Sequence, residues 1–377
     1  MSLRFIPMLL AVLAWASLNA AASPAAVPTN AEPLRVQAVA TGLEHPWALA
    51  FLPEGGYLVT ERPGRLRVID PQGRLGLPLA GLPEVAARGQ GGLLDVALDI
   101  SFERNRTLYF CFSEPAEGGT NSTALARARL PAGSARLEDV RVIFSQQPRV
   151  ASPLHFGCRI VQMPDGLLFL MLGERYQRMQ DAQKLDNHLG KVVRLTPEGA
   201  PAPGNPYIGR PGARPEIWSY GHRNPQGATI GPDGRLWMHE HGPQGGDEIN
   251  LPQAGRNYGW PLVTHGEQYG GGPIGEGLSA KPGLEPPLHH WTPSIAPSGM
   301  AFVTSDRYGR EWRGNLFIGS LKFNQLVRLE LAGTRVLREH RLEGVGERVR
   351  DVRQGPDGLL YLLTDSPKGR LLRVLPP

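Results

Sequence analysis

The sequence is poor in the features that anchor a cross-linked scaffold, a membrane domain or a nucleic-acid-binding surface. Only two of its 377 residues are cysteines, Cys111 and Cys158, which excludes a disulfide framework. The two cysteines could form one disulfide bridge or remain two separate buried thiols. After the N-terminal segment, no apolar run approaches the length of a membrane span. The formal net charge is only +5 and the basic residues are spread out, so we expect no nucleic-acid partner.

Residues 1–22 have the parts of a secretory signal peptide. Arg4 supplies the positive start, residues 5–18 are apolar but short and interrupted by proline, and residues 19–22 offer small side chains for cleavage. An uncleaved anchor is the alternative. We therefore expect a periplasmic or secreted protein with no stable membrane insertion. Residues 23–33, rich in alanine and proline, are expected to form a disordered linker before one domain over residues 34–377.

The rest of the chain has many turn-forming residues and almost no helical pattern. It contains 47 glycines and 36 prolines, while 41% of the residues are hydrophobic, which is typical of a large core built from short strands and many turns. Apolar segments of strand length recur in six similar units. These units span residues 47–69, 92–127, 159–195, 227–250, 299–329 and 349–374.

A tight turn recurs between the first two apolar segments of the units. It reads Pro-Asp-Gly at 164–166, 232–234 and 356–358, and Pro-Glu-Gly at 53–55. Proline presets φ, the aspartate bonds back to the backbone, and glycine takes a positive φ. Six such sheets around one axis predict an all-β fold, a six-bladed β-propeller with four-stranded antiparallel blades. Residues 34–40 alternate apolar and polar side chains, so we expect them to add the outer strand of the last blade and close the ring.

Two stretches lie outside this repeat. Residues 181–189 have the pattern of one short helix, and the glycine-rich residues 266–298 are expected to form a long loop over one face. Loops of that length in a compact domain are usually functional or disordered.

The most informative polar pair is His155 and Glu174. His155 precedes one apolar segment and Glu174 follows the next, and the turn at 164–166 between them would fold the two ends together. A carboxylate beside an imidazole sets its tautomer and raises its basicity, as a general base requires. Taken alone, a histidine at such a position is more often a packed or surface residue.

Other polar segments have alternatives that the residues leave open. Residues 89–95 are glycine-rich but lack the Lys-Ser/Thr of a phosphate-binding loop. Residues 240–248 resemble a hard-cation loop with exposed carbonyls and two carboxylates, although an ordinary acidic turn is equally plausible. His239 and His241 suggest zinc, but no third ligand is suitably spaced. Lys322, Arg348 and Arg350 stand at strand entries and would converge on the propeller channel, where they could hold an anionic ligand.

These segments together resemble the soluble quinoprotein glucose/sorbosone dehydrogenase family, in particular its aldose sugar dehydrogenases. The resemblance covers about residues 36–375. The segments that match the family are residues 155–159, 221–227, 242–250, 257–261 and 348–358. Their order and spacing make the combination more specific than any one of them.

The resemblance implies pyrroloquinoline quinone (PQQ) and Ca²⁺ as cofactors and a substrate that is an aldose sugar. In the family, C1 of the sugar is oxidised to a lactone by hydride transfer to PQQ. The catalytic residues it implies are His155 as general base, Glu174 as its acid partner and Arg223. The cofactor-binding residues it implies are Gln90, Arg223, Asn224, Tyr269, Lys322, Arg348 and Arg350. The calcium ligands it implies are Gly242 and Pro243, with Glu248 and Tyr258 at a second, structural site.

Two residues depart from the family pattern. The glucose-specific branch has an aspartate where this chain has Leu154, which favours the broader aldose branch. Cys158 stands where glycine or serine is usual, and its thiol could be oxidised. The short loops favour an open sugar groove and a monomer or weak dimer.

Three functions compete. The first is an exported aldose dehydrogenase that passes electrons to a quinone, a cytochrome or a dye. The second is a non-catalytic propeller that binds a sugar or a protein, which would be expected to lack His155 or the basic cluster. The third is a calcium-dependent lactonase, which would need several inward acidic ligands where this chain has mainly cations.

Overall fold

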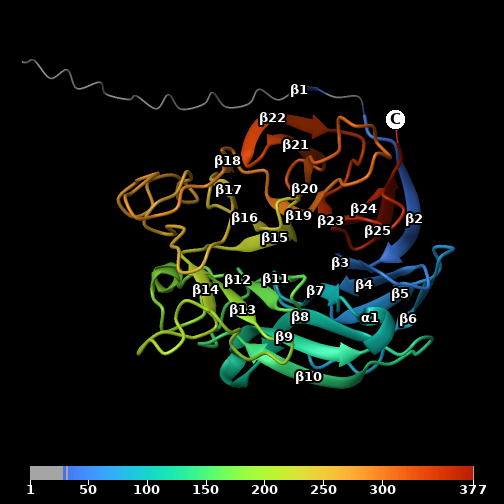
Figure 1. The fold of residues 1–377 in the computed structure, drawn as a ribbon, viewed down its shortest axis with the longest axis horizontal. Coiled ribbons are helices and arrows are strands. Elements are labelled where there is room, and N and C mark those ends of the chain that lie inside the picture. The colour runs from blue at the N-terminus through green and yellow to red at the C-terminus, as the bar shows by residue number, and fades with distance from the viewer. Residues whose placement is uncertain (1–28, 31–32, 377) are drawn as a thin grey trace, which may run out of the picture.

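Six β-sheets surround a central channel in the computed structural model, which describes residues 29–30 and 33–376 (Figure 1). Four of the sheets consist of four strands that are consecutive in sequence, one sheet adds an N-terminal strand to four such strands, and one joins an N-terminal strand to three. The first strands of neighbouring blades contact one another around the channel. The predicted six-bladed β-propeller with four-stranded antiparallel blades is therefore confirmed. The predicted signal peptide at 1–22 and most of the linker at 23–33 lie outside the described residues.

The blades follow one another along the chain. The first three comprise β3 (Pro46–Phe51), β4 (Tyr57–Glu61), β5 (Arg65–Ile69) and β6 (Leu75–Pro78); β7 (Leu93–Leu98), β8 (Thr107–Pro115), β9 (Asn121–Arg129) and β10 (Glu138–Ser145); and β11 (Gly157–Gln162), β12 (Leu168–Leu172), β13 (Lys191–Leu195) and β14 (Ile217–Tyr220). The other three comprise β15 (Pro225–Ile230), β16 (Leu236–Glu240), β17 (Asp247–Asn250) and β18 (His289–Trp291); β19 (Pro297–Phe302), β20 (Leu316–Ser320), β21 (Leu326–Ala332) and β22 (Arg335–Leu342); and β23 (Val349–Gln354), β24 (Leu360–Thr364), β25 (Gly369–Val374) and β2 (Val36–Leu43).

The ring is closed by pairing between the two ends of the described chain. Strand β2 runs antiparallel to β25, with Val36 opposite Val374 and Leu43 opposite Gly369 (Figure 1). This confirms that the segment beginning near residue 34 supplies the outer strand of the last blade. A two-residue strand, β1 (Thr29–Asn30), also pairs in parallel with β22 at the edge of the fifth blade.

The acidic side chains of the Pro-Asp-Gly turns act as the sequence predicted. Oδ1 of Asp165, Asp233 and Asp357 each accepts a hydrogen bond from the backbone N–H two residues on, at 3.0–3.1 Å. The glycine of each turn has a positive φ of 74–86°. These turns join the first and second strands of the third, fourth and sixth blades.

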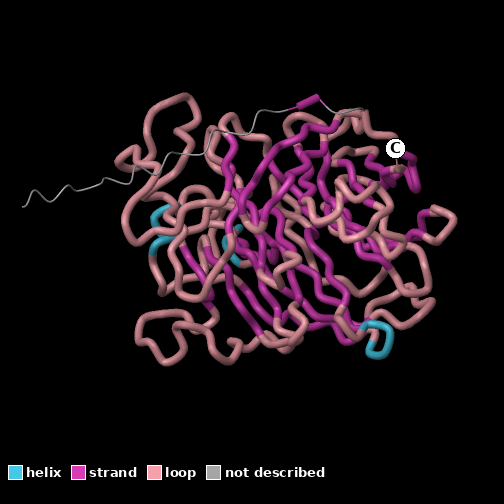
Figure 2. Tube along the Cα trace, turned by 45° about the horizontal axis from the view of Figure 1, so that its top comes forward, coloured by secondary structure: helices cyan, strands magenta, loops and turns pink. Residues whose placement is uncertain are grey.

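Helix is scarce among the described residues (Figure 2). The one α-helical turn is α1 (Phe102–Asn105), which the sequence did not indicate. The helix predicted over 181–189 is wrong, because only a 3₁₀ turn at Met179–Gln183 forms. The buried ammonium of Lys191 donates hydrogen bonds to the carbonyls of Asp181, Ala182 and Leu189, so these carbonyls bind the ammonium instead of extending a helix. None of the described helices is long and apolar enough to cross a membrane.

The loop predicted over 266–298 is only partly a loop. Residues 289–291 form β18, the outer strand of the fourth blade, and residues 297–298 begin β19. The rest contains turns rich in glycine and proline, which the residues of this stretch favour.

The two cysteines form a disulfide between the second and third blades. Cys111 lies in the middle of β8 and Cys158 in β11, with their Cα atoms 5.7 Å apart. Both side chains are fully buried in the apolar core shared by the first three blades. The bridge that the sequence left open is therefore present, and it anchors the strand that begins just after His155.

Four charged side chains bridge the blades inside the channel. The Arg159 guanidinium contacts Asp95 at 2.9 Å and Asp351 at 3.3 Å, and Arg353 binds both carboxylates at 3.0 Å. Arg159 also lies over the Trp47 ring. The four charged side chains come from the second, third and sixth blades, and Trp47 adds the first. The network therefore ties the inner strands of four blades together and balances two positive charges against two negative ones.

We predict that Arg159→Ala destabilises the fold strongly. The substitution leaves the buried Asp95 and Asp351 with one cation instead of two, which typically costs about 3–5 kcal/mol of unfolding free energy. Urea denaturation followed by fluorescence measures this loss. Arg313→Ala is the control, because its ion pair with Asp306 is exposed and should contribute at most about 1 kcal/mol. Equal losses in the two variants would contradict the prediction.

Candidate functional site

Polar residues gather at one mouth of the channel. Since neighbouring strands in a blade are antiparallel, the start of the first strand and the end of the second reach the same edge of the sheet. The polar residues just before first strands include Gln90, His155, Arg223, Asn224 and Arg348, and those just after second strands are Arg62, Glu174, His241, Lys322 and Asp365.

A cavity of about 530 Å³ opens at this mouth, and we call it the cation cavity. Its charged lining consists of Arg62, Lys322, Arg348, Arg350 and Asp365. Four positive side chains and one carboxylate leave an excess of three positive charges. Such a surface is suited to a ligand with several carboxylates or phosphates.

Five residues predicted to bind a cofactor line this cavity, namely Gln90, Asn224, Lys322, Arg348 and Arg350. The structure therefore brings together residues from five different blades or blade connections. Arg223 and Tyr269, which were predicted with them, line a neighbouring pocket instead. Trp47 and Arg62 of the first blade also line the cation cavity, although neither was predicted to bind a cofactor.

His155 and Glu174 meet as predicted. Nδ1 of His155 lies 2.9 Å from Oε2 of Glu174, and both side chains are almost fully buried. The backbone N–H of His155 donates to Oε1 of Gln90 at 2.8 Å, which links the imidazole segment to the cation cavity. The ring of Tyr176 packs edge-on against the imidazole with centroids 5.2 Å apart.

A tight turn places His155 beside Glu174. His155, Gly157 and Cys158 all have positive φ, and the pairing of β11 with β12 shifts register at this point. A Cβ on Gly173 would lie 2.0 Å from the His155 carbonyl oxygen, so only glycine permits this approach. The adjacent disulfide of Cys158 holds the same turn against β8.

The His155 imidazole is kept neutral at neutral pH. Burial lowers its pKa below the ordinary value of 6.5, the neighbouring Glu174 partly offsets this, and Arg223 and Arg175 lower the pKa further. With Nδ1 bonded to Glu174, the ring nitrogen left to accept a proton is Nε2.

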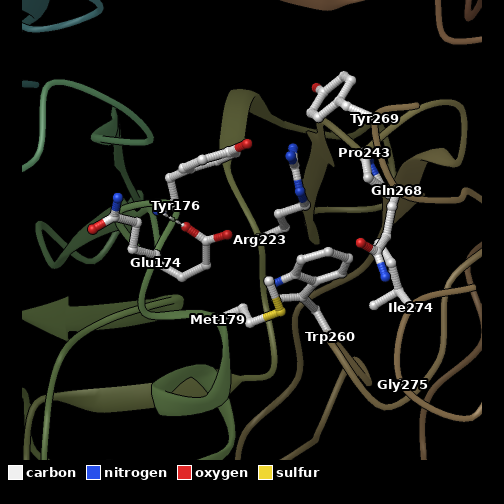
Figure 3. Close-up of a pocket in the computed structure, with 11 residues that line it drawn as sticks. Glu174, Tyr176, Met179, Arg223, Pro243, Trp260, Gln268, Tyr269, Ile274 and Gly275 are labelled. Carbon is white, nitrogen blue, oxygen red and sulfur yellow. Dashed lines mark hydrogen bonds between the residues drawn. The ribbon is translucent and has the colours of Figure 1, made fainter. Parts of the chain in front are cut away.

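Glu174, the partner of His155, lines a second pocket of about 420 Å³, which we call the aromatic pocket. In Figure 3, Glu174 and Tyr176 form one side, Trp260 and Tyr269 lie opposite, and the Arg223 side chain stands between them. Tyr269 is 63% exposed on the outer wall. The pocket thus combines aromatic surface with a carboxylate and a guanidinium, a combination that suits a neutral polar ligand.

Arg223 is held firmly between the two cavities. Its Nη1 donates to the carbonyl oxygens of Gly242 at 2.7 Å and His241 at 3.1 Å, and its guanidinium lies over the Trp260 ring. Its own carbonyl oxygen accepts a hydrogen bond from the N–H of Glu174. The guanidinium is therefore a fixed positive charge near His155.

The predicted calcium ligands fall into two groups in the structure. The Gly242 carbonyl is bonded to Arg223, and Pro243 lines the aromatic pocket. Asp247, the first carboxylate of this loop, accepts hydrogen bonds from the N–H groups of Gly242, Ile295 and Ala296. Asp247 therefore organises the loop. Among the described residues, no cluster of three or more His, Cys, Asp or Glu side chains suited to a metal is present.

Glu248 faces a second carboxylate across a small void. A space of about 10 Å³ is lined by Glu240, Glu248 and Gly242 among others. Burial, and then the charge of Glu240, raise the pKa of Glu248 to about 8. Tyr258 lines the same void, but its hydroxyl is used by the Leu251 carbonyl and the N–H of Gln253.

His239 and His241 do not form a zinc pair. His241 Nε2 is bonded to the Pro297 carbonyl, and burial lowers its pKa to about 3. His239 is fully buried beside Gly227. His241 lines the cation cavity, whereas His239 lies in the core.

Sequence reasoning did not select Tyr176, Trp260, Arg62 or Asp365, which line the two spaces. Arg62 and Asp365 directly follow the second strands of the first and sixth blades, as Glu174 does in the third. That shared position was a signal that could have identified them. Tyr176 and Trp260 lie in irregular segments, where no strand pattern fixes the direction of the side chain.

Comparisons with known proteins show what the whole chain is similar to. The family model described as Glucose / Sorbosone dehydrogenase matches residues 43–373. The Aldose sugar dehydrogenase YliI of Escherichia coli (strain K12) is 46% identical over 347 residues, which cover 91% of this chain and 93% of that protein. The solved apo-form of the soluble aldose sugar dehydrogenase from Escherichia coli superposes with a TM-score of 0.88 at 45% identity, covering 91% and 100% of the two chains. The PQQ-bound form of an aldose sugar dehydrogenase from Streptomyces coelicolor gives 0.74 at 30% identity, covering 92% and 100%.

We predict that Glu174→Gln lowers the pKa of His155 further. In the unmodified protein the imidazole should titrate below pH 6.5, because burial outweighs the carboxylate. Removing the negative charge of Glu174 removes the largest contribution that favours the protonated ring. Histidine NMR titration, with the signal assigned by its loss in His155→Gln, measures both midpoints. Tyr176→Phe retains the ring contact and should titrate like the unmodified protein, and an unchanged or higher midpoint in Glu174→Gln would refute the assignment.

Proposed function

Because the chain belongs to the glucose/sorbosone dehydrogenase family, we propose that it is a PQQ-dependent enzyme that oxidises the C1 hydroxyl of aldose sugars to lactones. The observation that supports this most directly is the position of the buried His155–Glu174 pair. Glu174 lines a pocket rich in aromatic side chains, and Phe156 and Gly157, which follow His155, line a cavity rich in cations. One space suits an anionic cofactor and the other a sugar.

The cation cavity fits PQQ by volume and by charge. PQQ is a flat tricarboxylate, and the lining has an excess of three positive charges in about 530 Å³. Arg62, Lys322, Arg348 and Arg350 would hold the carboxylates, and the amides of Gln90 and Asn224 offer further polar contacts. When bound, PQQ supplies an electrophilic ortho-quinone that accepts a hydride from C1 of the sugar.

His155 would remove the proton of the C1 hydroxyl. Its Nε2 is the free basic atom of a neutral ring, while Glu174 holds Nδ1 and stabilises the imidazolium once the proton arrives. Nε2 would take the hydroxyl proton while C1 loses a hydride to the acceptor that bound PQQ would supply, so C1 would gain a second bond to oxygen and the product would be a lactone. Burial of the pair keeps bulk water away from the transfer.

The aromatic pocket would bind the sugar. Tyr176 and Trp260 offer ring faces for the apolar C–H surface of a pyranose, and Gln268 and Glu174 offer hydrogen bonds to hydroxyls. Arg223 supplies positive charge where negative charge develops during the transfer. The exposed outer wall formed by Tyr269 leaves space for sugars of different length, which supports a broad aldose specificity.

We also propose a calcium requirement. Two carboxylates, Glu240 and Glu248, line a void large enough for one small ion, and like charges buried together favour a bound cation. The adjoining loop would offer the Pro243 carbonyl and the remaining lone pair of the Gly242 carbonyl, which also accepts from Arg223, as further oxygen ligands. Ca²⁺ would then hold the loop that presents Arg223 and Pro243 to the two cavities.

The disulfide supports an exported protein. A fully buried bond between Cys111 and Cys158 forms and persists in an oxidising compartment such as the periplasm or the exterior. This agrees with a signal peptide at residues 1–22 and with electron transfer to a quinone, a cytochrome or a dye.

We predict that PQQ bound to the purified protein is reduced on addition of an aldose, and that His155→Ala loses most of this activity. The variant should still bind PQQ, because the cations of the cavity are unchanged, and its turnover with an artificial dye should fall by about 10²–10⁴-fold. Cofactor absorbance and dye reduction measure the two properties separately. His290→Ala, which removes an exposed imidazole stacked on His265, should keep full turnover.

Two outcomes would contradict this assignment. Full turnover in His155→Ala would refute the role of the base. Stoichiometric PQQ binding with no reduction by any aldose would favour a non-catalytic binding propeller instead.

We predict that Ca²⁺ raises the thermal midpoint of the protein and that Glu248→Gln abolishes this response. Because the pKa of Glu248 is about 8, the metal-free carboxyl is mostly neutral at pH 7, and the amide should leave the metal-free midpoint nearly unchanged. Differential scanning calorimetry with EDTA and with excess Ca²⁺ measures both effects. Glu285→Gln, which removes a more exposed partner of Arg256, is the control and should keep the response. A calcium-dependent rise that persists in Glu248→Gln would place the ion elsewhere.

A further inference from the structure

Asp365 is the one carboxylate among the charged residues that line the cation cavity. It follows β24 directly, at the edge of the sixth blade that faces the channel mouth. Its side chain is only 12% exposed. A negative charge at this place is unexpected, because the surrounding groups otherwise suit an anionic ligand.

The Asp365 carboxylate holds three basic side chains. Oδ2 accepts hydrogen bonds from Arg348 Nη2 at 3.1 Å and from Arg350 Nη2 at 3.3 Å, and Oδ1 lies 3.1 Å from Nδ1 of His45. Its backbone N–H donates to the carbonyl of Arg348. Both arginines that line the cavity from the sixth blade therefore share one counter-charge.

Removing that counter-charge would leave the guanidinium of Arg350, which is 13% exposed, without a carboxylate partner beside the half-exposed Arg348. Burial, together with the charges of Arg348 and Arg62, lowers the pKa of Arg350, and Asp365 is the partner that opposes this effect. Burial opposes ionisation of Asp365, but Arg350, His45 and Arg348 lower its pKa and keep it charged. The carboxylate and the guanidinium groups thus stabilise one another while no ligand is bound.

We propose that Asp365 is a resident counter-ion that occupies the guanidinium groups of the empty cation cavity and competes for them with a carboxylate of the incoming cofactor. This inference rests on the proposed PQQ site. Its consequence is that Asp365 stabilises the cofactor-free chain and weakens cofactor binding. A ligand must offer more negative charge than one carboxylate to replace this contact, which favours a tricarboxylate over small monoanions.

The direction in which the PQQ affinity changes on loss of Asp365 distinguishes a competing counter-ion from a residue that only positions the arginines. If Asp365 served only to orient Arg348 and Arg350, Asp365→Asn would weaken PQQ binding. As a competing counter-ion, its loss removes repulsion toward the ligand and leaves guanidinium groups that lack a partner. Binding then becomes tighter, while the cofactor-free protein becomes less stable.

The experiment compares thermal midpoints and PQQ affinity in the full chain. In Asp365→Asn the cofactor-free midpoint should fall by roughly 2–4 °C. The rise on adding PQQ should exceed that of the unmodified protein, with a dissociation constant on the order of 10-fold lower by calorimetric titration. These readouts do not depend on turnover.

Glu61→Gln is the matched control. Glu61 is also a buried carboxylate that binds two arginines, Arg65 at 2.6 Å and Arg67 at 3.3 Å, but it lies outside the lining of the cation cavity. Its loss should lower the midpoint without increasing the rise caused by PQQ. The control therefore separates general loss of a buried ion pair from competition at the cofactor site.

Each outcome decides the inference. An unchanged or weaker affinity for PQQ in Asp365→Asn, with binding intact in the unmodified protein, would overturn the counter-ion role and leave the proposed function standing. If Asp365→Asn is recovered folded only when PQQ is present, the role is supported, and failure to fold even with PQQ overturns it. Absence of PQQ binding by the unmodified protein would overturn the proposed function and this inference together.

Discussion

The contact of the Arg159 guanidinium with Asp95 and Asp351 is the interaction on which the arrangement of the blades depends. A propeller brings the first strands of six sheets around one axis, and polar side chains that point inward there lose water. Here two arginines and two aspartates neutralise one another, and backbone N–H groups of Leu49 and Ile160 bind the same carboxylates. The balanced network separates the cation cavity at one mouth of the channel from a cavity of about 570 Å³, lined mainly by apolar side chains, at the other.

The charges of the arginines and aspartates inside the channel balance one another, whereas the charges at the channel mouth do not. This contrast supports placing the proposed function at the mouth. The cation cavity keeps an excess of positive charge, whereas Glu240 and Glu248 place two carboxyl groups at one small void, where burial and the charge of Glu240 raise the pKa of Glu248 to about 8. A trianionic cofactor would neutralise the excess of positive charge, and a divalent cation would bind the two carboxyl groups. Burial lowers the pKa of His155 in the neighbouring His155–Glu174 pair, so the proposed base and the two proposed ligand sites share one mouth of the propeller.

Several buried groups hold the turns that present the site. Lys191 binds three carbonyls and fixes the segment between Glu174 and the third strand of its blade. The Cys111–Cys158 bridge anchors the strand that follows His155. Asp247 binds the loop of Gly242 to the segment before β19. Because these groups are charged, polar or covalent, they give irregular segments a single conformation that apolar packing alone would not select.

The sequence by itself determined the fold and the meeting of His155 with Glu174. Strand length, the repeated Pro-Asp-Gly turn and antiparallel pairing place the start of one strand beside the end of the next, and these relations are local. The sequence could not determine whether Cys111 and Cys158 are bonded. It also could not determine that residues 181–189 are not helical or that Asp365 lies among the arginines of the cation cavity. Those outcomes depend on contacts between different blades, or between a loop and a buried side chain distant from it in sequence. The tertiary structure decided them, because the energies of burial and charge pairing are set by neighbours that local pattern does not specify.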